Sequence, residues 1–561
     1  MAQTTNDNKE ELVFLALGGL GEIGMNVYLY GLGPPKNRQW LMVDLGITFP
    51  GPHEPGVDVV LPDLRFITAE KQNLAGLVLT HAHEDHIGAI VECWPDLEVP
   101  IYATPFTMGM LKAKLSEYGS HLRPQLHEIP LGGRFDCGPF NIEFVSMTHS
   151  IPETSGLAIR TEQGLVVHSS DWKIDPGPMV GKPIDPVKMK AIGDEGVDVL
   201  VCDSTNVLRD GISPSETDVA DSLTEIIKTA PKRVAVTTFA SNVGRVLAVA
   251  NAAHAAGRHL VVAGRALHRV IDVAIDTGYL PDDFRYFEQD EFSNFDRKDI
   301  VVLLTGSQGE PRAALSRVAE GEHPEIKFSK GDLVIYSSRD IPGNEKAISR
   351  VQNALCRLGC RILTDREDLV HVTGHPRQDE LRQMYEWLQP RALIPMHGEA
   401  RHLRAHADFA RSCGIKSALV PEDGEVVKLL PGKLALIDEA PVGRRYRDGK
   451  LIISGDDSPV RERRKLSHVG IAVVSLAMTR RGEVVADPLV VLDGVPVDTR
   501  DDDLMEDVIL DTIDGTLESI PKGRRKNLDM VCDAVRRAVR AAFNEEWGKK
   551  PVVKVMLHVV E

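Results

Sequence analysis

The sequence is poor in cysteine: seven are scattered over 561 residues, and no two of them form a C-x-x-C pair. An odd number without close pairs excludes both a disulfide framework and a zinc site built from cysteines. We therefore expect buried, reduced thiols, and any metal site must use other residue types.

The chain also lacks a long apolar run, and no stretch approaches the length that spans a membrane. The opening residues, MAQTTNDNKEE, are polar and acidic, without the basic start and apolar segment of a secretory signal. These absences predict a cytoplasmic protein with no membrane partner.

Positive charge is in deficit, with 65 lysines and arginines against 82 aspartates and glutamates and a formal net charge of −17. This balance argues against a protein that coats nucleic acid through bulk electrostatics. It leaves room for an enzyme that holds a few phosphates in a local cationic cleft, where bound metal ions can add positive charge.

The length exceeds what one hydrophobic core supports, so we expect two to four domains. Strand-length apolar runs, separated by Gly and Pro, fill residues 11–80 and 130–205. From 215 to 380 helical patterns alternate with apolar strands, which indicates a parallel α/β domain inserted between two parts of another domain. The expected boundaries are 1–215 and 375–455 for the outer domain, 216–374 for the insertion, 456–465 for a linker and 466–561 for a small α+β domain.

Residues Gly19–Gly24 match the pattern G-x-G-x-x-G, with Asp44 about twenty residues further on. The segment that follows, Met25–Tyr30, has a strand pattern, whereas a dinucleotide site needs a helix N-terminus at this point. We therefore interpret the glycines as a structural turn.

The strongest chemical signal is the run His81-Ala82-His83-Glu84-Asp85-His86, directly after the apolar strand LAGLVLT. Histidines at i and i+2 leaving a strand can point into one pocket, and Asp85 and His86 begin an apparent helix that can reach a second metal. Imidazole and carboxylate suit Zn²⁺ or Mn²⁺. The alternative, a polar loop without metal, is disfavoured because buried unpaired ionisable groups are costly.

This H-x-H-x-D-H run resembles the metallo-β-lactamase superfamily, which implies further ligands at later strand ends. His149, Asp171 and His397 each follow an apolar strand. Alone, His149 would more often be a structural loop histidine and Asp171 a helix cap or turn residue. Their order and their strand-end positions make the set a strong signal.

The fuller resemblance, from about residue 12 to 450, is to the ribonuclease J family of the β-CASP group. It implies an α/β fold: an αββα metallo-β-lactamase sandwich, an inserted parallel α/β β-CASP domain and a small C-terminal α+β domain. Ala82 and Thr373 stand where Gly and Ser are commoner, and neither removes a ligand. The motifs that carry the resemblance are DSTN (203–206), FASN (239–242), TGSQGE (305–310), SSR (337–339), PGNE (342–345) and HVTGH (371–375).

The resemblance implies two Zn²⁺ ions per subunit, with Mn²⁺ or Mg²⁺ as substitutes. Two metals about 3.5–4 Å apart can lower the pKa of a shared water, so that hydroxide attacks phosphorus in line. One metal would be held by His81, His83 and His149, the other by Asp85, His86 and His397, and Asp171 would bridge them.

Three residues have implied catalytic roles. Asp85 would orient the hydroxide, and His375, held by Asp203, would give a proton to the leaving 3′-oxygen. Phosphate binding or capping is the alternative role for His375.

Substrate binding is expected at the loop 371–375, because a glycine, a hydroxyl and two imidazoles can offer donors to a phosphate. In ribonuclease J enzymes the equivalent loop contacts RNA beside a pocket for a 5′-monophosphate. The predicted substrate-binding residues are His371, Val372, Thr373, Gly374, His375, Ser241, Asn242, Ser337, Ser338 and Arg339. Four further side chains can either line an RNA channel or be solvated on the surface: Arg245, Arg265, Arg269 and Arg377.

The resemblance implies a metal-dependent ribonuclease that acts on single-stranded RNA. Both activities of such enzymes are expected: a 5′→3′ exonuclease that prefers 5′-monophosphate ends, and an endonuclease. Roles in mRNA decay and ribosomal RNA maturation are implied in the same way, as is a homodimer or homotetramer formed through the C-terminal domain.

Three alternatives compete with this interpretation. A small-molecule hydrolase of the same superfamily needs neither the large insertion nor the His375 loop. DNA-directed β-CASP nucleases usually lack a histidine at the position of His397. An inactive RNA-binding scaffold would typically have lost several ligands, and all seven are present.

Overall fold

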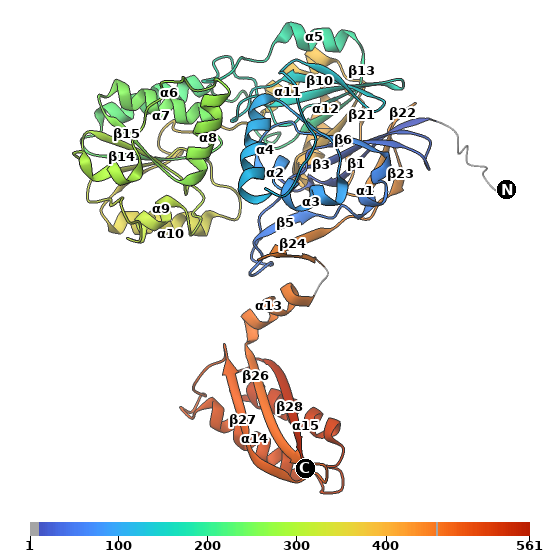
Figure 1. The fold of residues 1–561 in the computed structure, drawn as a ribbon, viewed down its shortest axis with the longest axis vertical. Helices are drawn as coiled ribbons and strands as arrows, with labels where there is room; N and C mark the ends of the chain where they lie inside the picture. Colours follow the sequence, from blue (N-terminus) through green and yellow to red (C-terminus); the bar gives the residue numbers. More distant parts are fainter. Residues whose placement is uncertain (1–9, 456–457) are drawn as a thin grey trace, which may run out of the picture. The chain divides into compact units, whose positions relative to one another are not determined.

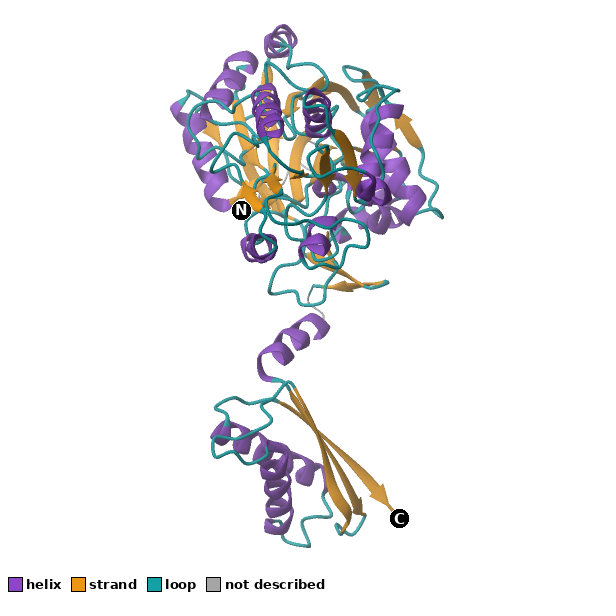
Figure 2. Cartoon of the chain, turned by 90° about the vertical axis from the view of Figure 1, so that its left-hand side faces the viewer, coloured by secondary structure: helices purple, strands orange, loops and turns teal. Residues whose placement is uncertain are grey.

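The computed structural model describes residues 10–455 and 458–561. The chain divides into two compact units, of which the second consists of Phe49–Val59 and Tyr446–Glu561 and the first of the other residues. The elements are labelled in Figure 1, and Figure 2 shows the strands of the first unit in its interior with helices around them.

Two sheets form the centre of the first unit. Strands at the middle of each are buried along nearly their whole length, as their continuous apolar runs predict. The first sheet has the order β23 (Ala435–Glu439), β22 (Glu425–Leu430), β1 (Glu11–Gly18), β3 (Val27–Gly33), β4 (Gln39–Val43), β6 (Leu74–Val78), β7 (Ile101–Ala103), β8 (Leu126–Glu128). The second has the order β21 (Ser417–Ala418), β19 (Ala392–Met396), β13 (Val197–Asp203), β12 (Gly164–His168), β11 (Ser155–Thr161), β10 (Phe140–Ser146), β9 (Arg134–Cys137).

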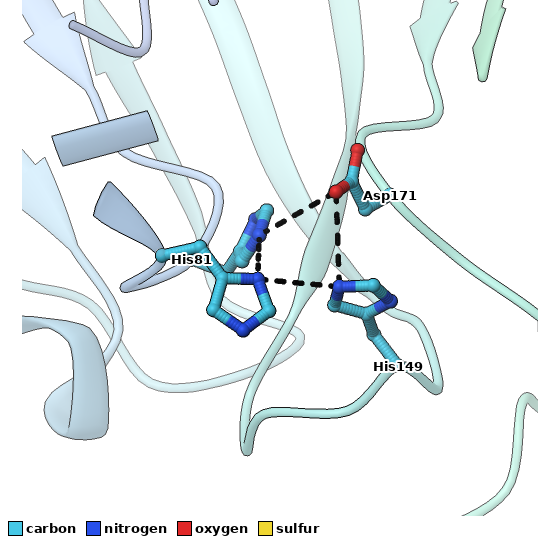
Figure 3. A group of neighbouring side chains, drawn as sticks. His81, His149 and Asp171 are labelled. Carbon is cyan, nitrogen blue, oxygen red and sulfur yellow. Dashed lines mark hydrogen bonds and ion pairs between the residues drawn. The ribbon is translucent and has the colours of Figure 1, made fainter. Parts of the chain in front are cut away.

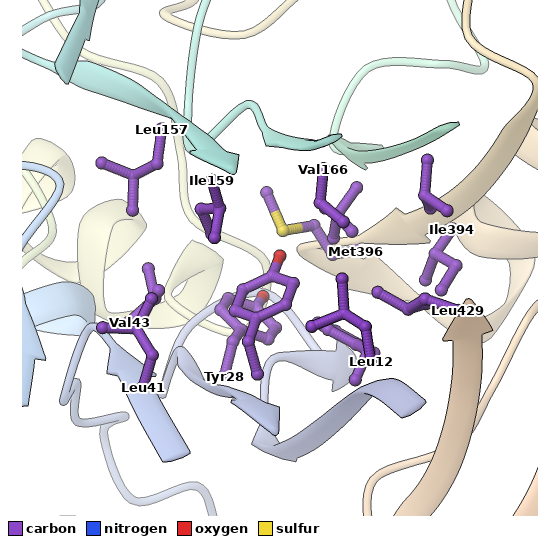
Figure 4. Close-up of a cluster of buried hydrophobic side chains, with 14 of the residues drawn as sticks. Leu12, Tyr28, Leu41, Val43, Leu157, Ile159, Val166, Ile394, Met396 and Leu429 are labelled. Atoms are coloured by element: carbon purple, nitrogen blue, oxygen red, sulfur yellow. The ribbon is translucent and has the colours of Figure 1, made fainter. Parts of the chain in front are cut away.

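The main hydrophobic core lies between these two sheets. Alternate residues of each strand point inward, because side chains alternate across a strand. Figure 4 shows Leu12 and Leu41 of the first sheet opposite Leu157, Ile159 and Val166 of the second, and all five side chains are buried. The two sheets therefore form one sandwich.

Helices cover the outer faces of the sandwich. On the second sheet, Met189 and Leu381 pack from two helices against the buried residues Val145 and Leu200, which extends the core outward. The sandwich is thus αββα, as expected. Its helices are α1 (Arg65–Ala69), α2 (Glu84–Ile87), α3 (Ile90–Leu97), α4 (Pro105–Tyr118), α5 (Pro186–Asp194), α11 (Gln378–Leu388) and α12 (Ala400–Ser412).

A third sheet of five strands, all parallel, is inserted in the chain between β13 and β19. These two strands are parallel neighbours in the sandwich, so the insertion leaves that sheet continuous. The expected inserted α/β domain is therefore confirmed. Its strands have the order β15 (His259–Ala263), β16 (Ile300–Leu304), β14 (Val234–Thr237), β17 (Leu333–Tyr336), β18 (Arg361–Leu363), and its helices are α6 (Glu216–Thr229), α7 (Val243–Ala255), α8 (Arg265–Asp276), α9 (Ala314–Ala319) and α10 (Glu345–Arg357).

The second unit contains the expected α+β domain. Its sheet has the order β27 (Val484–Asp493), β26 (Ile471–Thr479), β28 (Val552–Val560). Burial alternates along β26, and its inward residues pack against α14 (Met505–Ser519) and α15 (Leu528–Glu546). Within the predicted linker, 456–457 lie outside the described residues, and from Ser458 the chain forms α13 (Ser458–Val469) rather than an extended segment.

The cysteines differ in part from expectation. All seven are free; Cys93, Cys137, Cys202 and Cys360 are buried, but Cys356 is exposed, because it lies on the solvent side of α10, and the other two are half-buried. Among the described helices, none combines the length and the apolar character needed to cross a bilayer. The remaining described elements are β2 (Leu20–Gly21), β20 (Gly398–Glu399), β5 (Val59–Pro62), β24 (Arg444–Asp448), β25 (Leu451–Ser454) and the short helices η1 (Lys71–Asn73) and η2 (Gln289–Asn294).

Candidate metal centre

The predicted ligands lie where strands of the sandwich end. The His81–His86 run follows β6, and its last three residues fall in the short helix α2. His149 follows β10, Asp171 follows β12, and His397 follows β19. Because β12, β13 and β19 are parallel, their carboxyl ends meet at one edge of the sheet. Together with the end of β6 in the first sheet, this edge brings together side chains that are more than three hundred positions apart in the chain.

The first group contains His81, His83, His149 and Asp171, whose ligand atoms all lie within 4.8 Å of one another. The Nδ1 atom of His83 is 3.0 Å from Nε2 of His81 and 3.3 Å from Nε2 of His149. Figure 3 shows His81 and His149 directed towards Asp171, whose Oδ2 is 3.8 Å and 3.7 Å from their Nε2 atoms.

The second group contains Asp85, His86, Asp171 and His397, again within 4.8 Å. Nε2 of His397 is 3.3 Å from Oδ2 of Asp85, and Nε2 of His86 is 3.4 Å from Oδ2 of Asp171. Asp171 belongs to both groups, and its other oxygen, Oδ1, is buried and makes no hydrogen bond within the protein. The two groups have the composition that the sequence predicted for two metal sites; the ligand assignment itself stays a prediction.

Burial sets the protonation of the first group. It lowers the pKa of His83 to about 4 and that of His149 to about 3, and it holds the pKa of His81 well below its ordinary value. All three imidazoles are therefore neutral near pH 7. A neutral imidazole offers a lone pair, which is what a metal ligand requires.

The carboxylates dominate the second group. Burial alone would lower the pKa of His86, but Asp85, Asp171 and Asp44 raise it to about 10. Burial would also lower the pKa of His397, but Asp171, Asp203 and Asp85 hold it well above the ordinary value. The clustered carboxylates of Asp44, Asp85 and Asp171 thus favour positive charge beside them, which protonated imidazoles or bound divalent cations can supply. The donor set therefore fits divalent metal ions.

Supporting residues around the ligands were missed by sequence reasoning. Oδ2 of Asp44 is 2.7 Å from Nδ1 of His86, and the amide of Asn26 lies 3.0 Å from Nε2 of the same ring. The hydroxyl of Thr205 is 2.9 Å from Nδ1 of His397. Asp44 directly follows β4, a strand-end position like that of Asp171, which the resemblance singled out. Such contacts orient metal-ligating histidines.

His375 and Asp203 form a third group with Asp171 and His397. Nδ1 of His375 is 2.7 Å from Oδ2 of Asp203, and its ring stacks on that of His397 with centroids 5.4 Å apart. Burial would lower the pKa of His375, but Asp203 and Asp171 raise it. The carboxylate therefore fixes the orientation of this imidazole beside the ligands.

Several predicted substrate-binding residues touch the predicted metal ligands. The carbonyl oxygen of Gly374 is 2.6 Å from Nδ1 of His149, and Oγ of Ser241 is 3.1 Å from Nε2 of His83. The hydroxyl of Thr373 accepts hydrogen bonds from the amide of Asn206 and from the backbone N–H of His375. The loop 371–375 is thus held directly against the ligands.

Of the other predicted substrate-binding residues, some keep an unpaired polar atom and others are packed or hydrogen-bonded inside the protein. Oγ of Ser338 and Nδ1 of His371 are buried and make no hydrogen bond within the protein, and Arg339 lies nearby with one hydrogen bond to Asn206. By contrast, Val372 is packed in the interior, Ser337 hydrogen-bonds to the backbone below the loop, and the side chain of Asn242 caps α7. These three are turned inward.

The four arginines that were predicted either to line an RNA channel or to be solvated differ in their burial. Arg245 is fully buried, so it is neither an RNA-channel residue nor a solvated one, because its guanidinium is enclosed by other side chains and backbone oxygens. Arg265 is exposed, Arg377 is half-buried, and Arg269 is paired with Glu117 on the surface.

Sequence models of four protein families match stretches of the chain. They are the beta-lactamase superfamily domain (residues 53–236), the ribonuclease J beta-CASP domain (231–355), the Zn-dependent metallo-hydrolase RNA specificity domain (359–420) and the ribonuclease J C-terminal domain (459–560).

Relatives extend the similarity over nearly the full length. Ribonuclease J of Sinorhizobium meliloti is 51% identical over 548 residues, covering 98% of this chain and 97% of the relative. Those of Corynebacterium glutamicum and Helicobacter pylori are 37% and 32% identical, covering 96% and 98% of this chain and 74% and 80% of the relatives. A solved structure of a protein of unknown function from Enterococcus faecalis has a TM-score of 0.51 at 14% identity, covering 74% of this chain and all of that one, and supports the fold alone.

Proposed function

This chain belongs to the ribonuclease J family of metal-dependent ribonucleases, and we propose that it uses two Zn²⁺ ions to cut RNA as a 5′→3′ exonuclease and as an endonuclease. The observation that carries the proposal is the position of Asp171, which lies within ligand distance of two separate groups of histidines and carboxylates. A carboxylate shared in this way is suited to bridge a pair of metals. Mn²⁺ or Mg²⁺ would be accepted in place of zinc.

Seven residues of the chain would hold the two metal ions. His81, His83 and His149 would hold one ion, Asp85, His86 and His397 the other, and Asp171 both. When bound, two such ions activate a water and stabilise charge on the phosphate oxygens. Asp85 would orient the attacking water.

His375 would donate the proton that the leaving 3′-oxygen needs. Its Nδ1 is 2.7 Å from Oδ2 of Asp203, so Nε2 is the atom available to the substrate. The alternative role, binding of a phosphate, predicts a higher KM in His375→Gln with little change in kcat. Proton donation predicts the reverse, since glutamine can donate a hydrogen bond but cannot transfer a proton.

A preference for a 5′-monophosphate would come from the pocket beside this loop. Ser338 and His371 each keep a buried polar atom without a partner in the protein, and Arg339 adds a positive charge. An anion of the size of a phosphate can satisfy both atoms. The substrate would be a single strand, because a base-paired end cannot bring its terminal phosphate into a buried pocket.

The proposed assembly and cellular role rest on the C-terminal sheet and on the family. Leu489, Val491 and Met556 are exposed on one face of the C-terminal sheet, which supports a homodimer or homotetramer through this domain. Membership of the family supports a cytoplasmic enzyme of mRNA decay and ribosomal RNA maturation. The domain boundaries at 215, 374, 455 and 465 are part of the same proposal.

The decisive experiment offers the protein matched RNA strands with a 5′-monophosphate, triphosphate or hydroxyl, and a DNA strand of the same sequence, with Zn²⁺ or Mn²⁺. We expect mononucleotides from 5′-monophosphate RNA at the highest rate, slower internal cuts in the other RNA strands, and no DNA cleavage.

His81→Ala and Asp171→Ala should abolish hydrolysis and lower the bound metal. The control His254→Ala, at an exposed histidine of α7, should keep both. Full hydrolysis by either site variant would disprove the metal centre.

A further inference from the structure

Arg245 is fully buried in the inserted domain, and its guanidinium binds the residues that precede both candidate anion donors. Nη1 donates to the carbonyl oxygen of Val370 at 2.8 Å, and Val370 directly precedes His371. The same nitrogen donates to the carbonyl oxygen of Ser337 at 3.3 Å and to its hydroxyl, and Ser337 directly precedes Ser338. One side chain therefore holds the two segments that carry the candidate anion donors.

The same residue is tied to the metal ligands through its own helix. Arg245 lies in the first turn of α7, where its backbone N–H donates to the capping oxygen of Asn242 at 2.8 Å. Ser241, just before this cap, has its hydroxyl 3.1 Å from Nε2 of His83. The start of α7 thus contacts a metal ligand on one side and the pocket segments on the other.

A second buried ion pair extends this connection. Nη2 of Arg245 is 2.5 Å from a carboxylate oxygen of Glu216, and the backbone N–H of Glu216 donates to Asp175 at 3.0 Å. Asp175 in turn is paired with the buried Lys173 at 2.8 Å. Lys173 lies two residues after Asp171, and its backbone N–H donates to Thr148, the residue before His149. Buried charges therefore link the pocket to two more predicted ligands.

Such an arrangement has a physical cost that stability alone does not explain. Burying two ion pairs loses hydration that mutual attraction often only just offsets, and Nε of Arg245 makes no hydrogen bond within the protein. A planar guanidinium can bind several oxygens in fixed directions at once, whereas a lysine ammonium is a flexible point charge. This geometry fits a residue that fixes the distance between the two bound segments and the predicted metal ligands.

We propose that Arg245 is a positioning residue that holds Ser338 and His371 at a fixed distance from the metal ligands and thereby sets the preference for a 5′-monophosphate end. This inference rests on the proposed function of the pocket. A terminal phosphate bound there is productive only if the next phosphodiester reaches the metals, so a small shift of the pocket affects 5′-phosphorylated substrates selectively. Substrates without the phosphate do not use the pocket.

The test compares Arg245→Lys with a matched control, Arg233→Lys. Arg233 is also a buried arginine of this domain, paired with the buried Asp332, but it precedes β14 at the opposite end of the same sheet. For each protein, kcat/KM is measured on 5′-monophosphate and 5′-hydroxyl RNA, together with bound metal. We expect Arg245→Lys to lower the ratio of the two values at least about tenfold, with 5′-hydroxyl cleavage and metal content nearly unchanged. Arg233→Lys should keep the ratio of the unaltered protein.

Each other outcome is decisive. The inference is overturned if folded Arg245→Lys keeps the ratio of kcat/KM on 5′-monophosphate RNA to kcat/KM on 5′-hydroxyl RNA. It is also overturned if kcat/KM falls equally on both substrates, or if Arg233→Lys lowers the ratio as much as Arg245→Lys does. If Arg245→Lys does not fold, the neutral double variant Glu216→Gln/Arg245→Gln replaces it, since it leaves no unpaired charge at this position, and the same ratio decides. If the unaltered protein itself shows no 5′-monophosphate preference, the proposed function of the pocket is wrong and the inference falls with it.

Discussion

Gly374 illustrates how closely the loop 371–375 is packed against His149, a predicted metal ligand. A Cβ atom at this position would lie 2.5 Å from both Cε1 and Nδ1 of His149, a distance that non-bonded atoms do not tolerate. We predict that Gly374→Ala displaces the imidazole, lowers RNA hydrolysis by about 100-fold and reduces bound metal. Steady-state kinetics and metal analysis of the purified variant provide the check.

The control for this substitution is Gly515→Ala. Gly515 lies in α14, and a Cβ atom there would meet no other atom within 4 Å. This variant should hydrolyse RNA at the rate of the unaltered protein. Equal activity in both variants would show that the position of His149 tolerates the added methyl group.

Asp423 gives the protein a predictable pH dependence outside the metal centre. Burial and the nearby Glu22 raise its pKa from 3.8 to about 7, although the N–H of Leu20 donates to it at 3.2 Å. The folded state therefore binds more protons than the unfolded state between about pH 4 and 7. The free energy of unfolding must fall as the pH rises through this window and then level off.

Asp423→Asn removes this titration and keeps the acceptor for Leu20. Relative to the unaltered protein, we predict that the variant gains roughly 1–2 kcal/mol between pH 5 and pH 8, discounted because the side chain is partly exposed. Melting temperatures of both proteins at the two pH values test this. A difference that stays constant with pH would contradict the raised pKa.

At the scale of elements, one carboxylate near the candidate metal centre contributes to the contact between α4 and the end of α8. Glu153, four residues after His149, accepts hydrogen bonds from the N–H of Phe106 at 2.6 Å and from the hydroxyl of Tyr279 at 2.9 Å. Tyr279 follows α8, and its ring meets that of Phe106, in α4, edge to face. The sandwich and the inserted sheet are joined through these residues.

We predict that Tyr279→Phe lowers the free energy of unfolding by roughly 0.5–1.5 kcal/mol, because its hydrogen bond to the half-buried side chain of Glu153 is lost. Tyr286→Phe is the matched control, since its half-buried hydroxyl has only a 3.3 Å contact with His268. Urea denaturation of both variants gives the comparison. Equal stability of the two would exclude Glu153 as a structural link.

Helix α13 shows why one element escaped sequence reasoning. Its residues, SPVRERRKLSHV, are mostly polar or charged and have no apolar stripe, so nothing in the pattern distinguishes this helix from a linker. The helix is held by contacts that lie elsewhere in the chain, such as the ion pair between Arg463 and Asp448. Regular apolar patterns, as in β26 and α15, were recognised because packing repeats at the strand or helix period.

At the scale of the whole molecule, the C-terminal domain carries a hydrophobic core of its own. All buried members of this cluster come from residues 472–553. We predict that a fragment of residues 458–561 folds alone, with a cooperative thermal transition by circular dichroism. Phe543→Ala should destabilise the fragment by about 3–5 kcal/mol, because Phe543 is fully buried. A fragment without a cooperative transition would show that the core needs the rest of the chain.

The sequence, with its family resemblance, predicted the fold class and the residues that meet at the candidate metal centre. Strand patterns are local, and so is the fact that His149, Asp171 and His397 each follow one. These local signals were weak singly, and the resemblance to the metallo-β-lactamase superfamily was needed to select the three residues from other strand ends.

Only the tertiary structure decided which of the predicted substrate-binding residues keep an unpaired polar atom and which are turned inward. Arg245, Ser337 and Asn242 have the composition of substrate-binding residues, yet the fold turns them inward, while Ser338 and His371 keep a polar atom unpaired. Asp44 was visible as a strand-end acid, but its contact with His86 depends on how two strands pair. Burial and partners are properties of packing between distant segments, and no spacing along the chain encodes them.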